Sequence, residues 1–563
     1  MKDLYRCLDE YPPQMLRAIA EAWQTVLPEG ETLDLVGPLA EAMLRPNALS
    51  LLVESLTPEA RGVLAEFVEH GGVLPGQRLA LRFGGIRRLG PARIERERPW
   101  QEPANTLEEL YYKGLVYRAY GRVENHSGEI FIVPQQLLDR LPAPLMTMPF
   151  FSVETALTPA RIVVAGYALI EDLFAALVSI RQGQYPATQQ ERSDITPISV
   201  ERLALGDRLI GPNQPARLAL IQRLLWRLRL LHDEKGFWKP SLRAREWLRL
   251  TDEKRWRSVF LAWRDDPQWD ELRLLPSLRC EDTGWQNQPV VGRRNLLDVL
   301  GKCPPGQWLS LDSFIQALRR YRPDYLRPDG DFDRWFIRDA RTNEYLRGLA
   351  AWDEIEGALA RYIIAQPLFW LGGVELGYSE SSEQPFAFRL TALGHAALTG
   401  MAAPRTDLPS VLATISDDFT VVIPLAETMY QRYQLERLAE WQGQDETATY
   451  RLTAESVWQS YNAGIKTDQI LAFLKRLSGD RVSPHVLRSL QAWGGRFGRV
   501  LLRRAVVVQA VDEPTMKQIS ARPELRALIT DIIAPTMCLV EEEHLGELVK
   551  QLNELGIWPH FQH

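Results

Sequence analysis

The clearest pattern of apolar and polar positions lies in residues 449–510, where three successive segments repeat apolar residues at helical spacing. Thr453 precedes the first segment and Thr467 opens the second, as helix start signals. Ser483 followed by Pro484 opens the third, as an N-cap and a first helical residue. The apolar positions are Val457, Trp458 and Tyr461, then Ile470, Leu471, Phe473, Leu474 and Leu477, then Val486, Leu487, Leu490, Trp493 and Phe497. We therefore predict three short helices.

The pattern changes after the third predicted helix. Gly498 interrupts the helical spacing, and residues 499–509, which are dominated by Val and Leu, predict a strand. Three short helices followed by a strand is the order of a helix-turn-helix motif with a wing. In that arrangement the third helix, which begins after Ser483, would be the one that reads nucleic acid.

A similar order of helices and strands is predicted in residues 57–140. A helix capped by Thr106 precedes two apolar runs, at 115–117 and 129–133, which predict strands. The polar, glycine-containing residues 121–128 between them predict a turn. Helices followed by a two-stranded wing indicate a winged-helix module.

Residues 304–404 predict a second module of this kind. Its third helix would cover residues 353–364. The apolar runs 369–371 and 386–390 would be strands on either side of a polar wing at 377–385. The repeated order indicates duplicated modules, although not a regular solenoid.

The patterns as a whole predict a chain that is mainly α with small β elements, an α+β protein. Tandem winged-helix modules would be followed by a C-terminal α+β domain. The predicted segments are a helical N-terminal segment 1–56, a winged-helix module 57–140, a spacer with one packed helix 141–215, a helical region rich in Trp and Arg 216–303, a second winged-helix module 304–404 and the C-terminal domain 405–563.

Charge is distributed unevenly along the chain. The net charge of the 563 residues is -6, so any contact with nucleic acid must come from local basic patches. Between residues 475 and 504 a single acid, Asp480, accompanies eight basic residues. The candidate DNA-binding residues are Lys475, Arg476, Arg481, Arg488, Arg496, Arg499, Arg503 and Arg504, together with Arg78, Arg82, Arg87, Arg88 and Arg93. They would neutralise phosphates. The alternative is a solvated basic face, or one that meets an acidic protein.

The third helices of the two winged modules carry acidic residues instead. These are Glu108 and Glu109 in the first module and Asp353, Glu354 and Glu356 in the second. Carboxylates on these helices would repel phosphate. Contact with protein is therefore an alternative use of both modules.

Tryptophans alternate with basic residues between residues 238 and 269. Such a mixture can form a stacking platform for single strands. The near-helical spacing of the aromatic residues favours a buried core instead. The residues are Trp238, Trp247, Trp256, Trp263 and Trp269.

The sequence contains no recognisable set of catalytic residues. The motifs GxxxxGK[ST], GxSxG, HExxH and GxGxxG are absent, so a P-loop motor is excluded. The four cysteines are scattered, which predicts reduced thiols and no zinc site or other cofactor. Residues 252–254 match the D-x-K element of some nucleases, which leaves a cryptic metal-dependent nuclease as a remote alternative. We expect a protein that is not an enzyme.

One segment resembles a membrane span but carries charge at its centre. Residues 162–180 are largely apolar, yet Glu171 and Asp172 would each cost about 3 kcal/mol near the middle of a bilayer. We predict a buried core helix there. The N-terminus lacks the basic and apolar regions of a signal peptide, so we expect a cytoplasmic protein with no membrane partner.

Several short stretches of the C-terminal half form a distinctive set. They are 416–424 (SDDFTVVIP), 450–456 (YRLTAES), 463–464 with 470–474 (AG, then ILAFL), 483–493 and 556–559, with 388–394 (FRLTALG) and 352–357 (WDEIEG) upstream. Together they resemble the bacterial helicase-associated family, whose domain is similar to the N-terminal domain of XPB-type helicases. The layout is also similar to that of the winged-helix subunit that clasps XPB in the eukaryotic factor TFIIH.

The resemblance implies an XPB N-terminal-like domain in residues 405–563 and an accessory protein that lacks the motor. We expect a non-catalytic protein that binds DNA and partners an XPB-like helicase in DNA repair or transcription. The alternative is a scaffold that contacts only protein.

Overall fold

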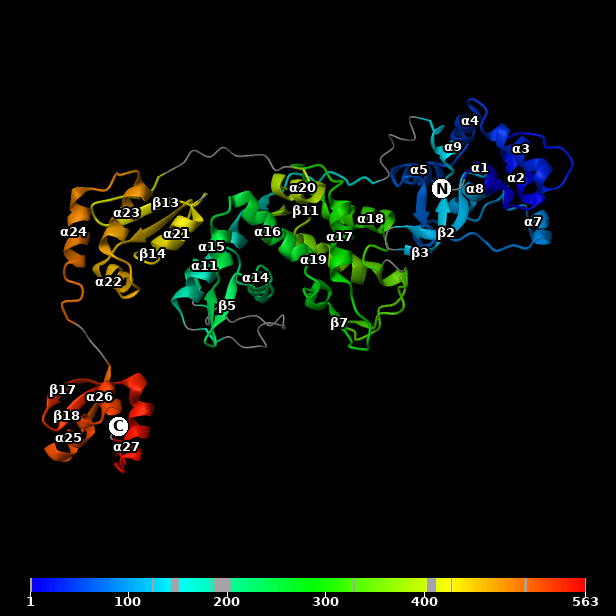
Figure 1. Cartoon of the computed structure of the whole chain (residues 1–563). Helices are drawn as coiled ribbons and strands as arrows, with labels where there is room; N and C mark the ends of the chain where they lie inside the picture. The colour runs from blue at the N-terminus through cyan, green and yellow to red at the C-terminus, as the bar shows by residue number, and fades with distance from the viewer. Residues whose placement is uncertain are drawn as a thin grey trace. The chain divides into compact units, whose positions relative to one another are not determined.

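The computed structural model describes residues 3–123, 126–142, 151–183, 185–186, 203, 205–327, 330–401, 412–426, 428–500 and 504–561 (Figure 1). Helices account for 48% and strands for 16% of the structure, which confirms the expected α+β class. The chain forms two compact units. Unit 1 comprises Met1–Val411, Ile423–Glu436 and Gly443–Ala448, and unit 2 comprises Leu412–Val422, Arg437–Gln442 and Thr449–His563.

Unit 1 begins with an N-terminal lobe that has its own apolar core. Local signals place its helices: the Thr57 hydroxyl accepts a hydrogen bond from the amide of Ala60 at 3.2 Å, and Pro58 is the first residue of the helix that follows. Val63, Leu64 and other apolar residues of that helix are buried in the core. The elements are α1 (Leu4–Asp9), α2 (Pro13–Ala22), α3 (Thr32–Met43), α4 (Ala48–Glu54), α5 (Pro58–Glu69), β1 (Val73–Pro75), α6 (Gly76–Phe83), α7 (Pro91–Glu97), α8 (Thr106–Tyr112), β2 (Tyr117–Val123), β3 (His126–Ile132) and α9 (Gln135–Leu138).

A central lobe with a larger core completes unit 1. Its core contains the five tryptophans of residues 238–269, all at most 7% exposed, so they are core residues and not a stacking surface. The elements are β4 (Arg161–Val163), α11 (Ala168–Gln182), η1 (Gly206–Arg208), α14 (Pro215–Arg227), β5 (Leu231–Glu234), β6 (Phe237–Pro240), α15 (Leu242–Leu248), α16 (Asp252–Arg264), η2 (Glu271–Leu274), β7 (Leu278–Cys280), α17 (Pro289–Leu300), β8 (Leu309–Ser310), α18 (Leu311–Tyr321), β9 (Ile337–Asp339), η3 (Leu349–Ala351), η4 (Asp353–Gly357), α19 (Ala358–Ile363), η5 (Ile364–Leu368), β10 (Val374–Tyr378), β11 (Ala387–Leu390), α20 (Ala392–Thr399) and α21 (Met429–Leu435).

The two lobes share an order of elements and a strand pairing. In the N-terminal lobe, β1 precedes α6 and pairs antiparallel with β3, the second strand of the hairpin that follows α8. In the central lobe, β8 precedes α18 and pairs antiparallel with β11, the second strand of the hairpin that follows the helical run from η4 to η5. The first strand of that hairpin, β10, also pairs with β4. Residues 161–163, expected in a spacer, thus belong to the central sheet.

The boundaries of both hairpins differ from the expectation. Strands β2 and β3 extend through Val123 and from His126, so the turn is shorter than residues 121–128. Residues 369–371 are not a strand, because Phe369 and Trp370 continue a buried helical run and β10 begins only at Val374. A short apolar run fits a buried helix end as well as a strand.

A close backbone contact explains why Thr391 and Gly394 occupy their positions in the FRLTALG stretch. The Thr391 hydroxyl caps α20 by accepting from the amide of Gly394 at 3.0 Å, and it donates to the carbonyl of Gly372 at 2.8 Å. A Cβ on Gly394 would collide with the carbonyl oxygen of Gly373. Only glycine therefore allows α20 to start this close to the end of the preceding helix.

The helix α11 is buried, as expected, and its two central acids pair with arginines. Glu171 accepts two hydrogen bonds from Arg432 on α21, and Asp172 pairs with Arg217 on α14. Burial raises the pKa of Asp172 in spite of Arg217. Among the described residues, no helix is long and apolar enough to cross a membrane.

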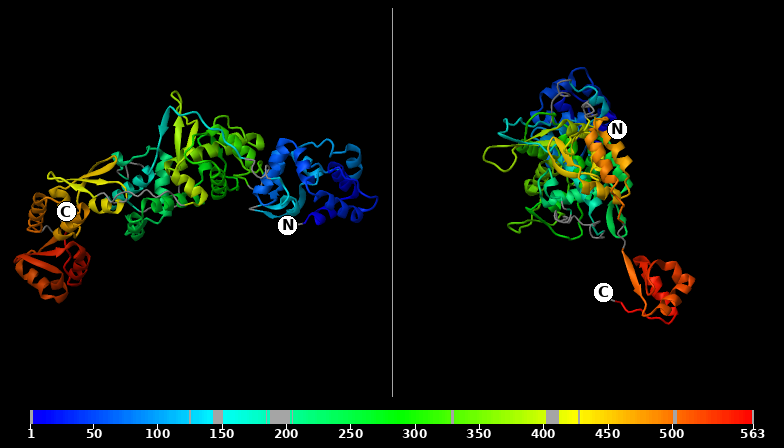
Figure 2. Two further views of the ribbon diagram at one scale, coloured as in Figure 1. Left: turned by 90° about the horizontal axis from the view of Figure 1, so that it is seen from above. Right: turned by 90° about the vertical axis from the view of Figure 1, so that its left-hand side faces the viewer.

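Unit 2 contains a three-helix segment and a C-terminal α/β segment, which Figure 2 shows from two further directions. The strand expected at 499–509 as a wing begins at Ala505 and pairs with β18 in the three-stranded sheet β16-β18-β17, so it belongs to the C-terminal segment. The elements are α22 (Ala454–Asn462), α23 (Thr467–Ser478), α24 (Pro484–Gly494), β16 (Ala505–Gln509), α25 (Glu513–Ala521), α26 (Pro523–Leu528), β17 (Ile529–Ala534), β18 (Met537–Glu541), η6 (Glu542–His544) and α27 (Leu545–Glu554). A further sheet, ordered β12-β13-β15-β14, consists of β12 (Thr414–Ile415), β13 (Thr420–Pro424), β15 (Thr447–Arg451) and β14 (Glu440–Gln444).

Candidate nucleic-acid interface

The second and third helices of unit 2 form a helix–turn–helix whose turn is defined by hydrogen bonds. Gly479 and Asp480 both adopt the left-handed conformation, with φ of 63° each, and the amide of Asp480 donates to the carbonyl of Lys475 at 2.7 Å. Ser483 then caps α24 by accepting from the amide of Val486 at 3.3 Å. The predicted start of α24 is confirmed, and it follows from local sequence alone.

One side of each helix is buried and the other is exposed. In α23, Ile470, Leu474 and Leu477 are buried, and in α24, Val486 and Leu490 are buried. The predicted apolar positions Trp458 and Phe497 are instead exposed, at 53% and 41%. The sequence pattern identified the buried stripe but overestimated its width.

The basic residues of this segment lie on the exposed side. They are located in the last turn of α23, in the turn after it, on the outer face of α24 and in the residues that follow α24. Within the part of the chain that the structure describes, none of them forms an ion pair, so their charge faces solvent. The exposed residues are Lys475, Arg476, Arg481, Arg488, Arg496, Arg499 and Arg504, while Arg503 lies outside the described residues. We call these seven the α23–α24 basic surface.

The Phe419 ring packs against two aromatic side chains of α24. Phe419 has a positive φ of 68° and lies against both His485 and Trp493, with ring centroids 5.6 and 5.1 Å apart. The turn that carries Phe419 is stabilised by Asp418, whose carboxylate accepts from the amide and the hydroxyl of Thr420 at 3.2 and 2.9 Å. These hydrogen bonds hold the pKa of Asp418 below its usual value. Asp418 thus fixes a turn.

The arginines of the first predicted patch are placed differently. Arg78 is buried and pairs with Asp324 at 3.3 Å, and Arg82 pairs with Glu66 at 2.7 Å through a side chain that is 3% exposed. Arg87 and Arg93 also form ion pairs, with Glu108 at 2.8 Å and with Glu97 at 2.9 Å, whereas Arg88 is exposed. These contacts direct Arg78 and Arg82 into the protein, so we leave both out of the proposed interface. A sequence pattern cannot show such pairing, because the partners are up to 246 residues away.

The acids of α8 are not presented to solvent, although the sequence favoured that interpretation. Glu108 is fully buried, where it accepts from Arg87 and from the amide of Ala104. Glu109 accepts from the hydroxyl of Thr57 at 2.9 Å. The helix cap is Asn105, one residue before the predicted Thr106, and its side chain accepts from the amide of Glu108 at 3.0 Å. The acids of α8 stabilise the lobe and do not form an acidic surface.

The acids of the second module divide between the interior and the surface. Glu356 is buried and pairs with Arg327 at 2.6 Å, whereas Asp353 and Glu354 are exposed. Asp353 forms an ion pair with Arg319. Glu354 is thus the acid of this helix whose charge faces solvent without an ion pair among the described residues.

The described residues hold no group of three or more potential metal ligands. The Asp252 carboxylate of the D-x-K match pairs with the buried Arg255.

Burial raises the pKa of the Cys280 thiol to about 11 and that of the Cys303 thiol to about 12. Both groups therefore lack the thiolate form that nucleophilic chemistry requires.

Residues 413–534 match the family described as helicase conserved C-terminal domain. The match covers under a quarter of the chain and includes α22, α23 and α24 with the α23–α24 basic surface. It ends with strand β17, so β18 and α27 lie beyond it. The chain therefore carries a helicase-related C-terminal domain. A comparison with curated proteins gives no match.

Proposed function

We propose that this chain is a non-catalytic DNA-binding accessory protein that partners an XPB-like DNA helicase in DNA repair or transcription. The observation that carries the proposal is the α23–α24 basic surface, because its residues lie exposed without ion pairs to the described residues and inside the helicase-related segment. The sequence has no GxxxxGK[ST] motif, so the ATP-driven step would belong to the partner.

The geometry favours α24 as the element that approaches DNA. It is the second helix of a helix–turn–helix, and its outer face presents His485, Arg488 and Gln491. Arg481 precedes the helix, and Arg496 follows it. Flanking cations of this kind contact phosphates, while side chains on the outer face would reach base edges.

Both lobes of unit 1 would act as winged-helix modules in this proposal. Their shared order of elements, and the pairing of β1 with β3 and of β8 with β11, support that assignment. Most arginines of the first module are engaged in ion pairs, so we assign these modules to contacts with the helicase partner and not to DNA.

Fluorescence anisotropy of labelled duplex and forked DNA, titrated with the full chain at two salt concentrations, tests the DNA-binding part. We expect binding that weakens steeply with salt. Replacing Arg488 and Arg496 together by Ala should lower the affinity and reduce the slope of log K against log salt by about 1 to 2, since each lost phosphate contact removes about 0.9. The matched control is Arg243→Ala with Arg245→Ala, two exposed arginines of α15 in unit 1. Equal affinity and slope for both double variants would overturn the assignment.

A scaffold that contacts only protein is the second candidate. The observation in its favour is the charge of the C-terminal segment, where Asp and Glu outnumber Lys and Arg by nine to four in residues 505–561. Adding an XPB-like helicase to the titration separates the two candidates. DNA binding that appears only with the helicase, and is indifferent to Arg488→Ala with Arg496→Ala, would favour the scaffold.

A further inference from the structure

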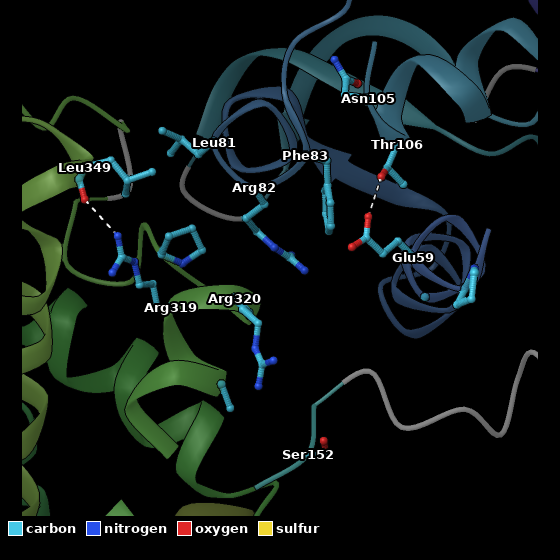
Figure 3. Close-up of a pocket in the computed structure, with 14 residues that line it drawn as sticks. Glu59, Leu81, Arg82, Phe83, Asn105, Thr106, Ser152, Arg319, Arg320 and Leu349 are labelled. Atoms are coloured by element: carbon cyan, nitrogen blue, oxygen red, sulfur yellow. Dashed lines mark hydrogen bonds between the residues drawn. The ribbon is translucent and has the colours of Figure 1, made fainter. Parts of the chain in front are cut away.

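A cavity of about 840 Å³ lies in unit 1, between helices of the N-terminal lobe and helices of the central lobe (Figure 3). The start of α5, the end of α6 and the start of α8 form one wall, and the last turns of α18 form the other. The volume lies within the range of about 300 to 1,000 Å³ that is typical of small-molecule sites. None of the sequence patterns described above identified this site.

Arginines reach into the cavity from both walls. Figure 3 shows Arg82 extending from the N-terminal lobe, and Arg319 and Arg320 from α18. Carboxylates outside the lining hold two of these guanidinium groups, because Glu66 pairs with Arg82 and Asp353 pairs with Arg319. These ion pairs hold the two guanidinium groups in place and neutralise their charge.

Arg320 is the cation of this lining that can bind a ligand. It is exposed, and within the described residues it has no ion pair or hydrogen bond. Glu59 is the one carboxylate among the lining residues, and it accepts a hydrogen bond from the hydroxyl of Thr106 at 3.2 Å. Because Glu66 and Asp353 already pair with Arg82 and Arg319, Arg320 is the lining group that an anionic ligand would contact.

The rest of the lining is largely apolar. The Arg82 guanidinium lies over the Phe83 ring, 4.5 Å from its centroid, and both residues line the cavity. Leu81, Pro323 and Leu349 extend this surface. Nucleobases stack on aromatic rings, so the partly exposed Phe83 ring is suited to a base.

The two walls are fixed to each other by contacts beside the cavity. Arg78 on α6 pairs with Asp324 just after α18, and both side chains are less than 10% exposed. Glu69 on α5 accepts from the hydroxyl of Tyr321 at 3.3 Å and pairs with Lys302. A site whose walls are held in place loses less entropy when a ligand binds.

We propose that this cavity binds a phosphorylated nucleoside, with the phosphate at Arg320 and the base against Phe83. The ligand would be either a free nucleotide or a nucleotide of a single strand, since both present the same chemistry. This site is separate from the α23–α24 basic surface, so it does not depend on the proposed function. It would give unit 1 a ligand of its own.

The test uses the full chain carrying Arg488→Ala and Arg496→Ala, so that binding at unit 2 is reduced in every arm. Adenosine monophosphate is titrated by calorimetry, and a short fluorescein-labelled oligo(dT) strand by anisotropy. Arg320→Ala removes the phosphate contact, and Ser152→Trp fills the cavity without changing its charge. The control is Arg243→Ala, which removes an exposed arginine of α15. Circular dichroism confirms that each variant is folded.

We expect Arg320→Ala to weaken binding about tenfold, as the loss of a charge-assisted hydrogen bond does, and Ser152→Trp to abolish it. Arg243→Ala should leave the affinity unchanged. Binding of adenosine monophosphate would identify a free nucleotide, and binding of oligo(dT) alone would identify a single strand. No saturable binding below about 1 mM in either arm, or equal affinity for wild type, Arg320→Ala and Ser152→Trp, would overturn the proposal.

Discussion

Glu171 and Arg432 are 261 residues apart in the sequence and form a buried, two-pronged ion pair, with Nη1–Oε2 and Nη2–Oε1 distances of 2.7 and 2.6 Å. The pair joins α11 in the middle of the central core to α21, which lies inside the segment that matches the helicase C-terminal domain. Met429 and Tyr433 of α21 belong to the same core. Part of the matched segment is thus built into unit 1.

Replacing Arg432 by Met should destabilise unit 1 by about 3 to 5 kcal/mol, because Glu171 would remain as a buried charge without its counterion. Urea unfolding followed by circular dichroism measures the change. The double variant Glu171→Leu with Arg432→Leu should recover most of the loss, since an apolar pair leaves no charge behind. A single variant as stable as wild type would show that the pair contributes nothing.

The unfolding free energy should fall as the pH rises from about 4.5 to 7, because of Glu356. Burial raises the pKa of this carboxyl from 4.5 to about 7, and the effect outweighs the attraction of Arg327. Between these two values the folded protein binds the proton and the unfolded chain does not, so stability falls with rising pH until the folded form also ionises near pH 7. The separation of the two pKa values corresponds to about 3 kcal/mol.

Two glutamine variants isolate this contribution. Glu356→Gln cannot ionise, so its stability relative to wild type should rise between pH 5 and pH 8. Glu354→Gln, at an exposed position two residues earlier, should follow wild type at every pH. Parallel curves for wild type and Glu356→Gln would contradict the assignment. Urea unfolding at a series of pH values provides the measurement.

Arg82→Met should cost stability and leave DNA affinity unchanged. The Arg82 side chain pairs with Glu66, which is fully buried, so its removal should destabilise unit 1 by about 3 kcal/mol or more. Anisotropy with duplex DNA, corrected for the folded fraction, should give the wild-type affinity. A specific loss of affinity in folded protein would return Arg82 to the DNA interface. Arg88→Ala, at an exposed position of the same stretch, is the matched control.

Ser483→Ala should loosen α24 without affecting unit 1. The hydroxyl caps the helix at the amide of Val486, and loss of such a cap costs about 1 kcal/mol. Hydrogen exchange of the amides of residues 486–494 should therefore speed up about fivefold. Ser483→Asp, which keeps a capping acceptor, should exchange at the wild-type rate. Unchanged exchange in the alanine variant would show that the cap is not needed.

Local signals were sufficient to locate helices. Ser483 with Pro484, Thr453 and Thr57 each mark a helix start where the structure has one, because a cap depends on residues three positions apart. The burial of α11 also followed from its sequence, because two charges at its centre exclude a membrane span. The α+β class and the exposure of Arg488 followed from the spacing of apolar residues, because Arg488 lies off the buried stripe of α24.

Long-range pairing was not predictable from the sequence. Arg78 looked like part of a basic patch, yet it pairs with Asp324, 246 residues away. Strand β16 looked like a wing of the preceding helices, yet its partner β18 comes from the end of the chain. The cavity at Arg320 requires two lobes to meet, and no local pattern records such a meeting.

The placement of α21 determines how this protein can be divided. A cut before residue 412 would produce a C-terminal fragment that contains all of unit 2 but also carries α21, whose core partners remain on the other piece. That fragment would expose Arg432 and Tyr433 to water, and the remainder would leave Glu171 without its counterion. Neither piece would keep this core intact, so we expect both to be less stable than the whole chain.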